Sequence, residues 1–134
     1  MSNASSADAE RQLLAARRSG ARLAAVQALY QMEQTEQSTR SVIADFMGDR
    51  LGLNDEGEPI EEADPDIFKT IVNGVVEHQE QIDVAIMKRL ATGWKIERLD
   101  ATSRAILRAA VYELVAEISL PSQIILDEYV SLAH

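Results

Sequence analysis

Apolar residues recur at helical spacing along most of the chain. The first such stretch runs from about Ala7 to Gln34, and a second begins directly after Asp64-Pro65. Both are rich in residues with high helix propensity, and their apolar positions are three or four residues apart. No stretch alternates apolar and polar residues as a half-buried strand would. The pattern therefore predicts an all-α protein.

The first predicted helix, about Ala7–Gln34, carries one apolar stripe that we expect to be buried. Gly20 interrupts the pattern, so the part before it is expected to fray or to order only on binding. We interpret residues 1–16 as a flexible polar leader and residues 17–134 as one helical domain. The stripe consists of Leu23, Val26, Leu29 and Tyr30.

A shorter helix is predicted over Ser41–Leu51, followed by an acidic loop from Gly48 to Asp66. Glycines, prolines and eight acidic residues against the single Arg50 are typical of a solvated loop. Calcium binding at Asn54–Glu58 is a weak alternative, because the alternating ligands and closing glutamate of an EF-hand are absent. The apolar positions of the short helix are Val42, Ile43, Phe46 and Met47.

Asp64 followed by Pro65 predicts a helix start, with an N-cap and a proline in the first turn. The helical period then continues to a break near Thr92-Gly93. The expected buried stripe is Phe68, Ile71, Val72, Val75 and Val76, continued by Ile82, Ala85, Ile86 and Leu90.

The strongest predicted helix covers Asp100–Ile118 and has a wide apolar face, which indicates a central position. A breaker at Ser119–Ser122 precedes one last helix. Six helices with mostly short loops predict a helical bundle. The wide face consists of Ile106, Leu107, Ala110, Val111, Leu114, Val115 and Ile118.

Composition restricts the chemistry. The chain contains no cysteine, which excludes disulfides and thiolate catalysis and indicates a reducing cytoplasm. No apolar run approaches the roughly 18–20 residues of a membrane span. Only 4% of the residues are aromatic, so the core has to be built from Ala, Leu, Ile and Val.

Charge is distributed unevenly along the chain. The net charge is -9, yet the segment from Arg11 to Met32 contains four arginines and no acidic residue. Guanidinium groups bind phosphate in bidentate fashion and stack on unpaired bases. The segment, with Arg11, Arg17, Arg18 and Arg22, is therefore a candidate nucleic-acid interface.

No catalytic, cofactor or metal site is predicted. His78 and His134 are isolated in the sequence and lie in no known ligand motif. Trp94 is interpreted as a core anchor between helices. Arg104 and Arg108 could bind a phosphate, but structural ion pairs are favoured, with Glu113, Glu117 and Glu128 as partners.

Several sequence blocks resemble a known family. Ala25–Tyr30 (AVQALY) follows the arginines, Trp94–Leu99 (WKIERL) comes later, and Arg104–Leu114 (RAILRAAVYEL) follows it. In this order and spacing, together with Leu120-Pro121, Asp127-Glu128 and Leu132-Ala133, they resemble the NusB family of bacterial transcription antitermination factors. The resemblance extends from Arg17 to His134.

The resemblance implies a fold of two packed helical subdomains. It implies binding of boxA RNA jointly with the small-subunit ribosomal protein NusE, within the RNA polymerase antitermination complex that supports transcription of ribosomal RNA operons. It assigns RNA binding to Arg17, Arg18 and Arg22, and partner binding to Tyr30 and Gln27. It implies no enzymatic step and a cytoplasmic location.

The chain departs from the family pattern in a few places. Ser19 and Gly20 interrupt the arginine run, and Ser103 stands where many members have an acid. Asp127 replaces a common asparagine, and the family continues into a further helix beyond His134. Two alternatives stay open: an RNA-presenting domain of a ribosomal RNA methyltransferase, and a purely protein-binding helical adaptor. Homodimerisation through the ligand surface is also open.

Overall fold

The computed structural model describes residues 3–50, 63–89, 95–116 and 132. Every regular element in these ranges is a helix, so the all-α prediction is confirmed. The elements are α1 (Asn3–Thr35), α2 (Thr39–Asp45), the π-helical turn η1 (Phe46–Arg50), α3 (Pro65–Glu77), α4 (Gln79–Met87), the 3-10 turn η2 (Ile96–Arg98) and α5 (Ala101–Ala116).

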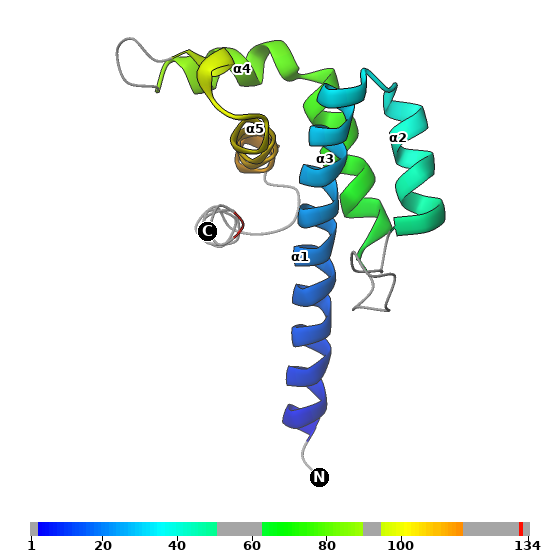
Figure 1. The fold of residues 1–134 in the computed structure, drawn as a ribbon. Coiled ribbons are helices and arrows are strands. Elements are labelled where there is room, and N and C mark those ends of the chain that lie inside the picture. Colours follow the sequence, from blue (N-terminus) through cyan, green and yellow to red (C-terminus); the bar gives the residue numbers. More distant parts are fainter. Residues whose placement is uncertain (1–2, 51–62, 90–94, 117–131, 133–134) are drawn as a thin grey trace.

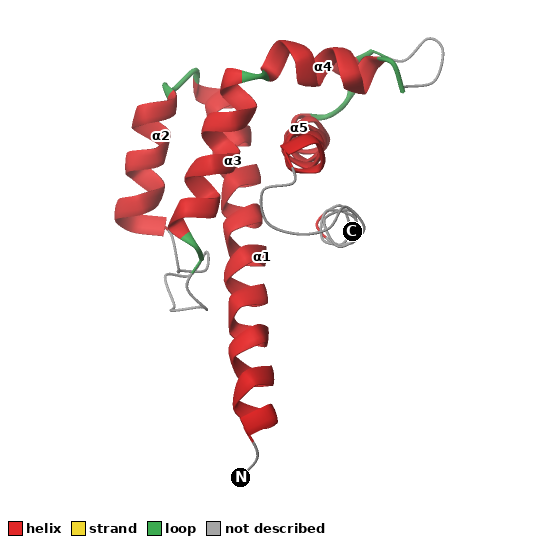
Figure 2. Cartoon of the chain, turned by 180° about the vertical axis from the view of Figure 1, so that it is seen from behind, coloured by secondary structure: helices red, strands yellow, loops and turns green. Residues whose placement is uncertain are grey.

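The helices form two groups joined by α5. The first group consists of α1, α2 and α3, which all contact one another, and the second of α4 and α5. Since α5 also packs against α1 and α3, it joins the two groups. Figure 1 shows α1 as the long axis of the molecule, with its N-terminal half extending beyond the other described helices. Figure 2 shows α2 and α3 beside α1 from behind.

The first helix begins earlier than the sequence analysis placed it. It runs without a break from Asn3 through Gly20 to Thr35, so residues 3–16 of the expected polar leader are helical. Alanine, leucine, arginine and glutamine favour helix even where little packs against them. A Cβ at Gly20 would lie 3.3 Å from the Cβ of Ala63, so Gly20 marks a close approach rather than a helix break.

The buried face of α1 differs from the predicted stripe. Val26 is buried, but Leu23 and Tyr30 are 43% and 42% exposed, so the prediction was wrong for these two residues. The helix instead buries its small residues, which let neighbouring backbones approach closely. These residues are Ala21, Ala24, Ala25 and Ala28.

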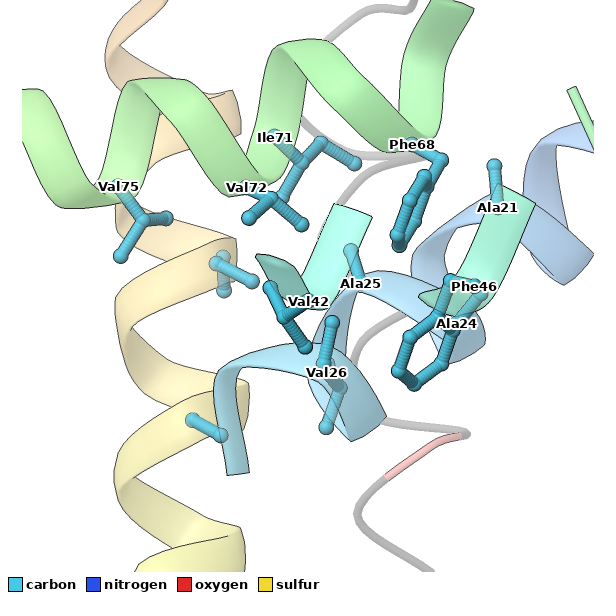
Figure 3. Close-up of a cluster of buried hydrophobic side chains, with 14 of the residues drawn as sticks. Ala21, Ala24, Ala25, Val26, Val42, Phe46, Phe68, Ile71, Val72 and Val75 are labelled. Atoms are coloured by element: carbon cyan, nitrogen blue, oxygen red, sulfur yellow. The ribbon is translucent and has the colours of Figure 1, made fainter. Parts of the chain in front are cut away.

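The start of α3 agrees with the prediction. The Oδ1 atom of Asp64 accepts hydrogen bonds from the backbone N–H groups of Asp66 (2.9 Å) and Ile67 (3.1 Å), and Pro65 occupies the first turn. Val76 is 39% exposed, so it does not belong to the buried stripe. The other four predicted positions, Phe68, Ile71, Val72 and Val75, are fully buried in the core that Figure 3 shows.

The predicted short helix is present, but its bounds differ from the predicted Ser41–Leu51. α2 begins after an N-cap at Ser38, whose side chain accepts a hydrogen bond from the N–H of Ser41. Val42 and Phe46 are buried, whereas Met47 is exposed. The ring of Phe46 stacks on that of Phe68 at 5.5 Å between centroids, which ties η1 to α3 (Figure 3).

The helical spacing of apolar residues continues beyond α3, but the chain itself changes direction at His78. This residue, with φ -112° and ψ 20°, ends α3 and precedes α4. The His78 ring stacks on Tyr112 of α5 at 6.3 Å. The Tyr112 ring also covers Gly74, where a Cβ would lie 2.0 Å from the Tyr112 Cζ atom. Gly74 therefore makes room for α5.

The predicted apolar face of α5 is confirmed in part, since Ala110 is buried and Ile106, Leu107, Val111 and Leu114 are partly buried against the core. Val115 is 80% exposed, whereas the buried residues are Ala105, Ala109, Ala110 and Glu113. Four predictions fall on residues outside the described ranges: the Trp94 anchor, the Asn54–Glu58 calcium alternative, the role of His134, and most of the last helix. Of that helix, Leu132 is described as helical and packs against the core.

Candidate nucleic-acid interface

The predicted RNA-binding arginines lie on α1 but not on one face. Successive residues of an α-helix point about 100° apart, so Arg17 and Arg18 diverge, whereas Arg18 and Arg22 share a face. Arg17 and Arg18 are both half-buried, and the Nε atom of Arg18 has no hydrogen-bond partner among the described residues. Arg11, further out on α1, pairs with Asp8 at an exposed site.

Arg17 also lies where the first helix group closes. Its backbone carbonyl accepts a hydrogen bond of 3.0 Å from the N–H of Asp64, the N-cap of α3. Three residues further along α1, Gly20 lies close to Ala63, the residue before Asp64. One flank of the arginine segment is thus fixed to the start of α3.

Arg22 is inside the protein. Its side chain is 1% exposed, and its Nε atom donates to both carboxylate oxygens of Glu113 on α5, at 2.9 and 3.2 Å. Glu113 itself is 0% exposed. Removing one partner of a buried ion pair leaves an uncompensated charge, at a cost of about 3–5 kcal/mol. Arg22 therefore does not fit the expected role of a surface RNA ligand.

The sequence carried no signal for this pair. The two residues are 91 positions apart, and Glu113 was assigned as a partner of Arg104 or Arg108. Neither assignment is correct, since Glu113 faces α1. Arg22 looked like part of a basic surface because periodicity alone does not show which side of a helix its neighbour covers.

Arg104 and Arg108 do form structural ion pairs, as favoured, but with other acids. Arg104 binds the carboxylate of Glu33 on α1 through Nε and Nη2, and Nη1 donates to the backbone carbonyl of Leu99. Arg108 binds Asp83 of α4 through two bonds of 2.9 and 3.0 Å, and its Nη1 lies 3.4 Å from Glu33. The network joins α1, α4 and α5.

This network changes the acid–base behaviour of its members. The hydrogen bond from Arg104 is the main cause of a lowered pKa for Glu33, and the charges of Arg104 and Arg108 add to it. The same bond raises the pKa of Arg104. Both guanidinium groups are thereby committed to carboxylates, so a phosphate site at this pair is not supported.

The expected partner-binding residues lie together on the exposed side of α1. Gln27 and Tyr30 are exposed and one turn apart, and Leu23 continues the same face one turn earlier. We call Leu23, Gln27 and Tyr30 the α1 outer face. An aromatic and an aliphatic side chain on an exposed helix face are typical of a protein contact.

Other parts of the described structure bear on metal, ligand and membrane sites. They contain no group of three or more histidine, aspartate or glutamate side chains placed to hold a metal ion. A groove of about 400 Å³ lies between α4 and α5 and is lined mainly by apolar side chains, including Ile82, Val111 and Tyr112. Among the described helices, none combines the length and apolar character needed to cross a membrane.

The arrangement defines an all-helical domain with an arginine-bearing first helix, and solved structures share it. A chain of T. maritima NusB matches with a TM-score of 0.70 at 25% identity, over 87% of this chain and 75% of that one. A chain in the crystal structure of a plectonemic RNA supercoil matches with a TM-score of 0.71 at 28% identity, over 87% and 78%. The NusB-like fold is therefore confirmed.

The sequence comparisons identify the family. The profile described as the NusB family matches residues 19–134. The transcription antitermination protein NusB of Hyphomonas neptunium is 66% identical over 119 residues, which cover 89% of this chain and 77% of that protein. The NusB of Caulobacter vibrioides is 49% identical over 116 residues, covering 87% and 78%. The chain belongs to the NusB family of transcription antitermination proteins.

Proposed function

We propose that the protein acts in transcription antitermination by binding boxA-containing RNA jointly with ribosomal protein NusE, as part of the RNA polymerase antitermination complex. The observation that carries the proposal is the arginine segment of α1, in which no acidic residue occurs from Arg11 to Met32 on a chain of net charge -9. Phosphate binding depends on such local positive charge rather than on net charge. Family membership supports the same role.

Arg17 and Arg18 are the RNA ligands in this mechanism. They diverge around α1, so each holds a different phosphate or stacks on a different unpaired base. Arg22 stays paired with Glu113 inside the fold, so it contributes to the packing of α1 rather than to the surface that contacts RNA. The protein makes and breaks no bond and needs no cofactor, and it works in the cytoplasm, where transcription takes place.

The α1 outer face is the surface proposed for NusE. Tyr30 provides an aromatic ring that is 42% exposed, and Gln27 supplies hydrogen-bonding groups beside it. Such a contact would leave Arg17 and Arg18 available to RNA, since they lie further toward the N-terminus of α1. NusE then supplies the additional base contacts, and joint binding is tighter than binding by either protein alone.

The test is fluorescence anisotropy of a labelled boxA RNA, titrated with the protein alone and with NusE, at two salt concentrations. The variant Arg17→Gln/Arg18→Gln should bind more weakly and lower the salt slope by about 1.4, the value for two lost phosphate contacts on a single strand. Arg40→Gln, an exposed arginine on α2, is the matched control. An affinity unchanged by the double substitution would contradict the RNA-binding assignment.

The same titration separates the alternative roles. Binding of NusE without any RNA binding would identify a protein-binding adaptor that uses the α1 outer face. If NusE binding competes with self-association of the protein, a homodimer uses the same surface around Tyr30. In that case Tyr30→Ala should weaken both NusE binding and dimerisation.

A further inference from the structure

The buried pair of Arg22 and Glu113 lies at the base of the arginine segment. Arg22 follows Arg18 by four residues, so both point to the same flank of α1, the flank that faces α5. On the other flank the backbone of Arg17 is bonded to Asp64 of the α3 N-terminus. The segment is therefore held at two points on different sides of the helix axis.

Packing alone specifies the rotation of α1 weakly. Its buried apolar residues around this point are Val26 and four alanines, and the alanine methyl groups make low ridges between helices: Ala21, Ala24, Ala25 and Ala28. Helices pack by fitting ridges of side chains into grooves, so a face made mostly of alanine, with Val26 as its one larger buried apolar side chain, distinguishes only weakly between neighbouring rotations. A buried polar pair excludes those that separate its partners, and fixing the register is the best-attested use of such pairs.

We infer that Glu113 is a positioning residue for RNA binding: through Arg22 it fixes the rotation of α1, and so determines the directions of Arg17 and Arg18. The inference rests on the proposed RNA-binding function. Glu113 itself touches no RNA, since it is 0% exposed. It lies 91 positions after Arg22 in the sequence and acts on the binding site through its ion pair with Arg22.

The test compares Glu113→Gln with Glu33→Gln. Both remove one carboxylate from an ion pair between α1 and α5, but Glu33 lies at the other end of α1, bonded to Arg104. We expect Glu113→Gln to weaken binding of boxA RNA roughly tenfold, as for the loss of one charge-assisted contact, and to lower the salt slope. Glu33→Gln should leave both quantities unchanged. Circular dichroism establishes that each variant is folded.

A second variant keeps the site packed without charge. Arg22→Met/Glu113→Met replaces the pair by side chains of similar length, an exchange that is often neutral or stabilising. It should remain folded and bind RNA as weakly as Glu113→Gln. If Glu113→Gln binds as well as or better than the original protein while the double variant loses binding, Arg22 contacts RNA directly and the inference is wrong.

A measurement without RNA tests the rotation itself. The chain has no cysteine, so spin labels attach only at the introduced pair Gln12→Cys and Thr102→Cys, both exposed positions on α1 and α5. Removing the Arg22–Glu113 pair should broaden the distance distribution between the labels. If removing the pair changes neither these distances nor the RNA affinity, the inference about Glu113 is wrong, whereas the proposed RNA-binding function is not affected. Absence of RNA binding by the original protein, with and without NusE, would overturn the proposed function and the inference with it.

Discussion

Replacing Gly74 by alanine tests how closely α3 and α5 approach each other. In an exposed helix interior this change would stabilise the protein by up to about 1 kcal/mol, because alanine has the higher helix propensity. Here the new Cβ would lie 2.0 Å from Cζ and 2.5 Å from Oη of Tyr112. Such an overlap cannot be relieved by a shift of a few tenths of an ångström. The ring has to turn away as a unit, and it then loses its packing on Gly74 and its stacking on His78.

The expected result is a net loss of stability. Overpacking in a filled site costs about 1–3 kcal/mol, and an overlap of this size belongs to the upper end of that range. Subtracting the propensity gain of about 1 kcal/mol leaves Gly74→Ala destabilised by about 2 kcal/mol. Urea unfolding followed by circular dichroism should show a lower midpoint with an unchanged m-value. Gly48→Ala is the matched control, since nothing lies within 4 Å of a Cβ at that position. It should be neutral or slightly stabilising.

A double-mutant cycle identifies Tyr112 as the cause. In a Tyr112→Ala background the obstacle is gone, so Gly74→Ala should become neutral or stabilising, and the two substitutions should couple by more than about 1 kcal/mol. A Gly74→Ala variant as stable as the original protein would refute the reasoning. So would an equal effect of Gly74→Ala with and without the tyrosine ring.

Three further substitutions test local features. Glu36 adopts a φ of 57° just after α1, a left-handed conformation that glycine adopts more easily. Glu36→Gly should therefore raise the free energy of unfolding, measured by urea titration, by about 0.5–1 kcal/mol. A lower free energy of unfolding would contradict backbone strain at Glu36. Asp64→Ala removes the N-cap of α3 and should lower the melting temperature through a loss of about 1 kcal/mol, and no change would mean that the cap is dispensable. The pKa of Glu33 is lowered by Arg104, so its stabilisation is complete above the unfolded pKa of about 4.3 and is lost as pH falls through the folded pKa. Glu33→Gln should therefore reduce stability near pH 7 and flatten its decline in acid, and an unaltered decline would exclude this pair as a cause.

Features set by neighbouring residues could be predicted from the sequence. The start of α3 follows from Asp64 and Pro65, because an N-cap and a first-turn proline act within three residues. Four of the five predicted stripe positions of α3 are buried, because the 3.6-residue period of an apolar face is a property of the helix itself. The all-α class follows from the same periodicity.

The candidate site could be predicted only in part. The arginine segment was recognised from composition, and family resemblance predicted a partner contact at Tyr30, but the exposure of Tyr30 was not predicted from the apolar stripe. The burial of Arg22 was missed because it depends on Glu113, 91 positions away. The partners of Arg104 and Arg108 were missed for the same reason, since Glu33 and Asp83 come from α1 and α4.

The sequence by itself thus determined the all-α class, the residue at which α3 begins, and the segment in which positive charge is concentrated. The tertiary structure decided which side of each helix is covered. It buried the alanines of α1 rather than Leu23 and Tyr30, and it left Val115 exposed on α5. The physical reason is range: capping and periodicity act over a few residues along one helix, whereas burial and ion pairing depend on how separate helices pack, which no local pattern encodes.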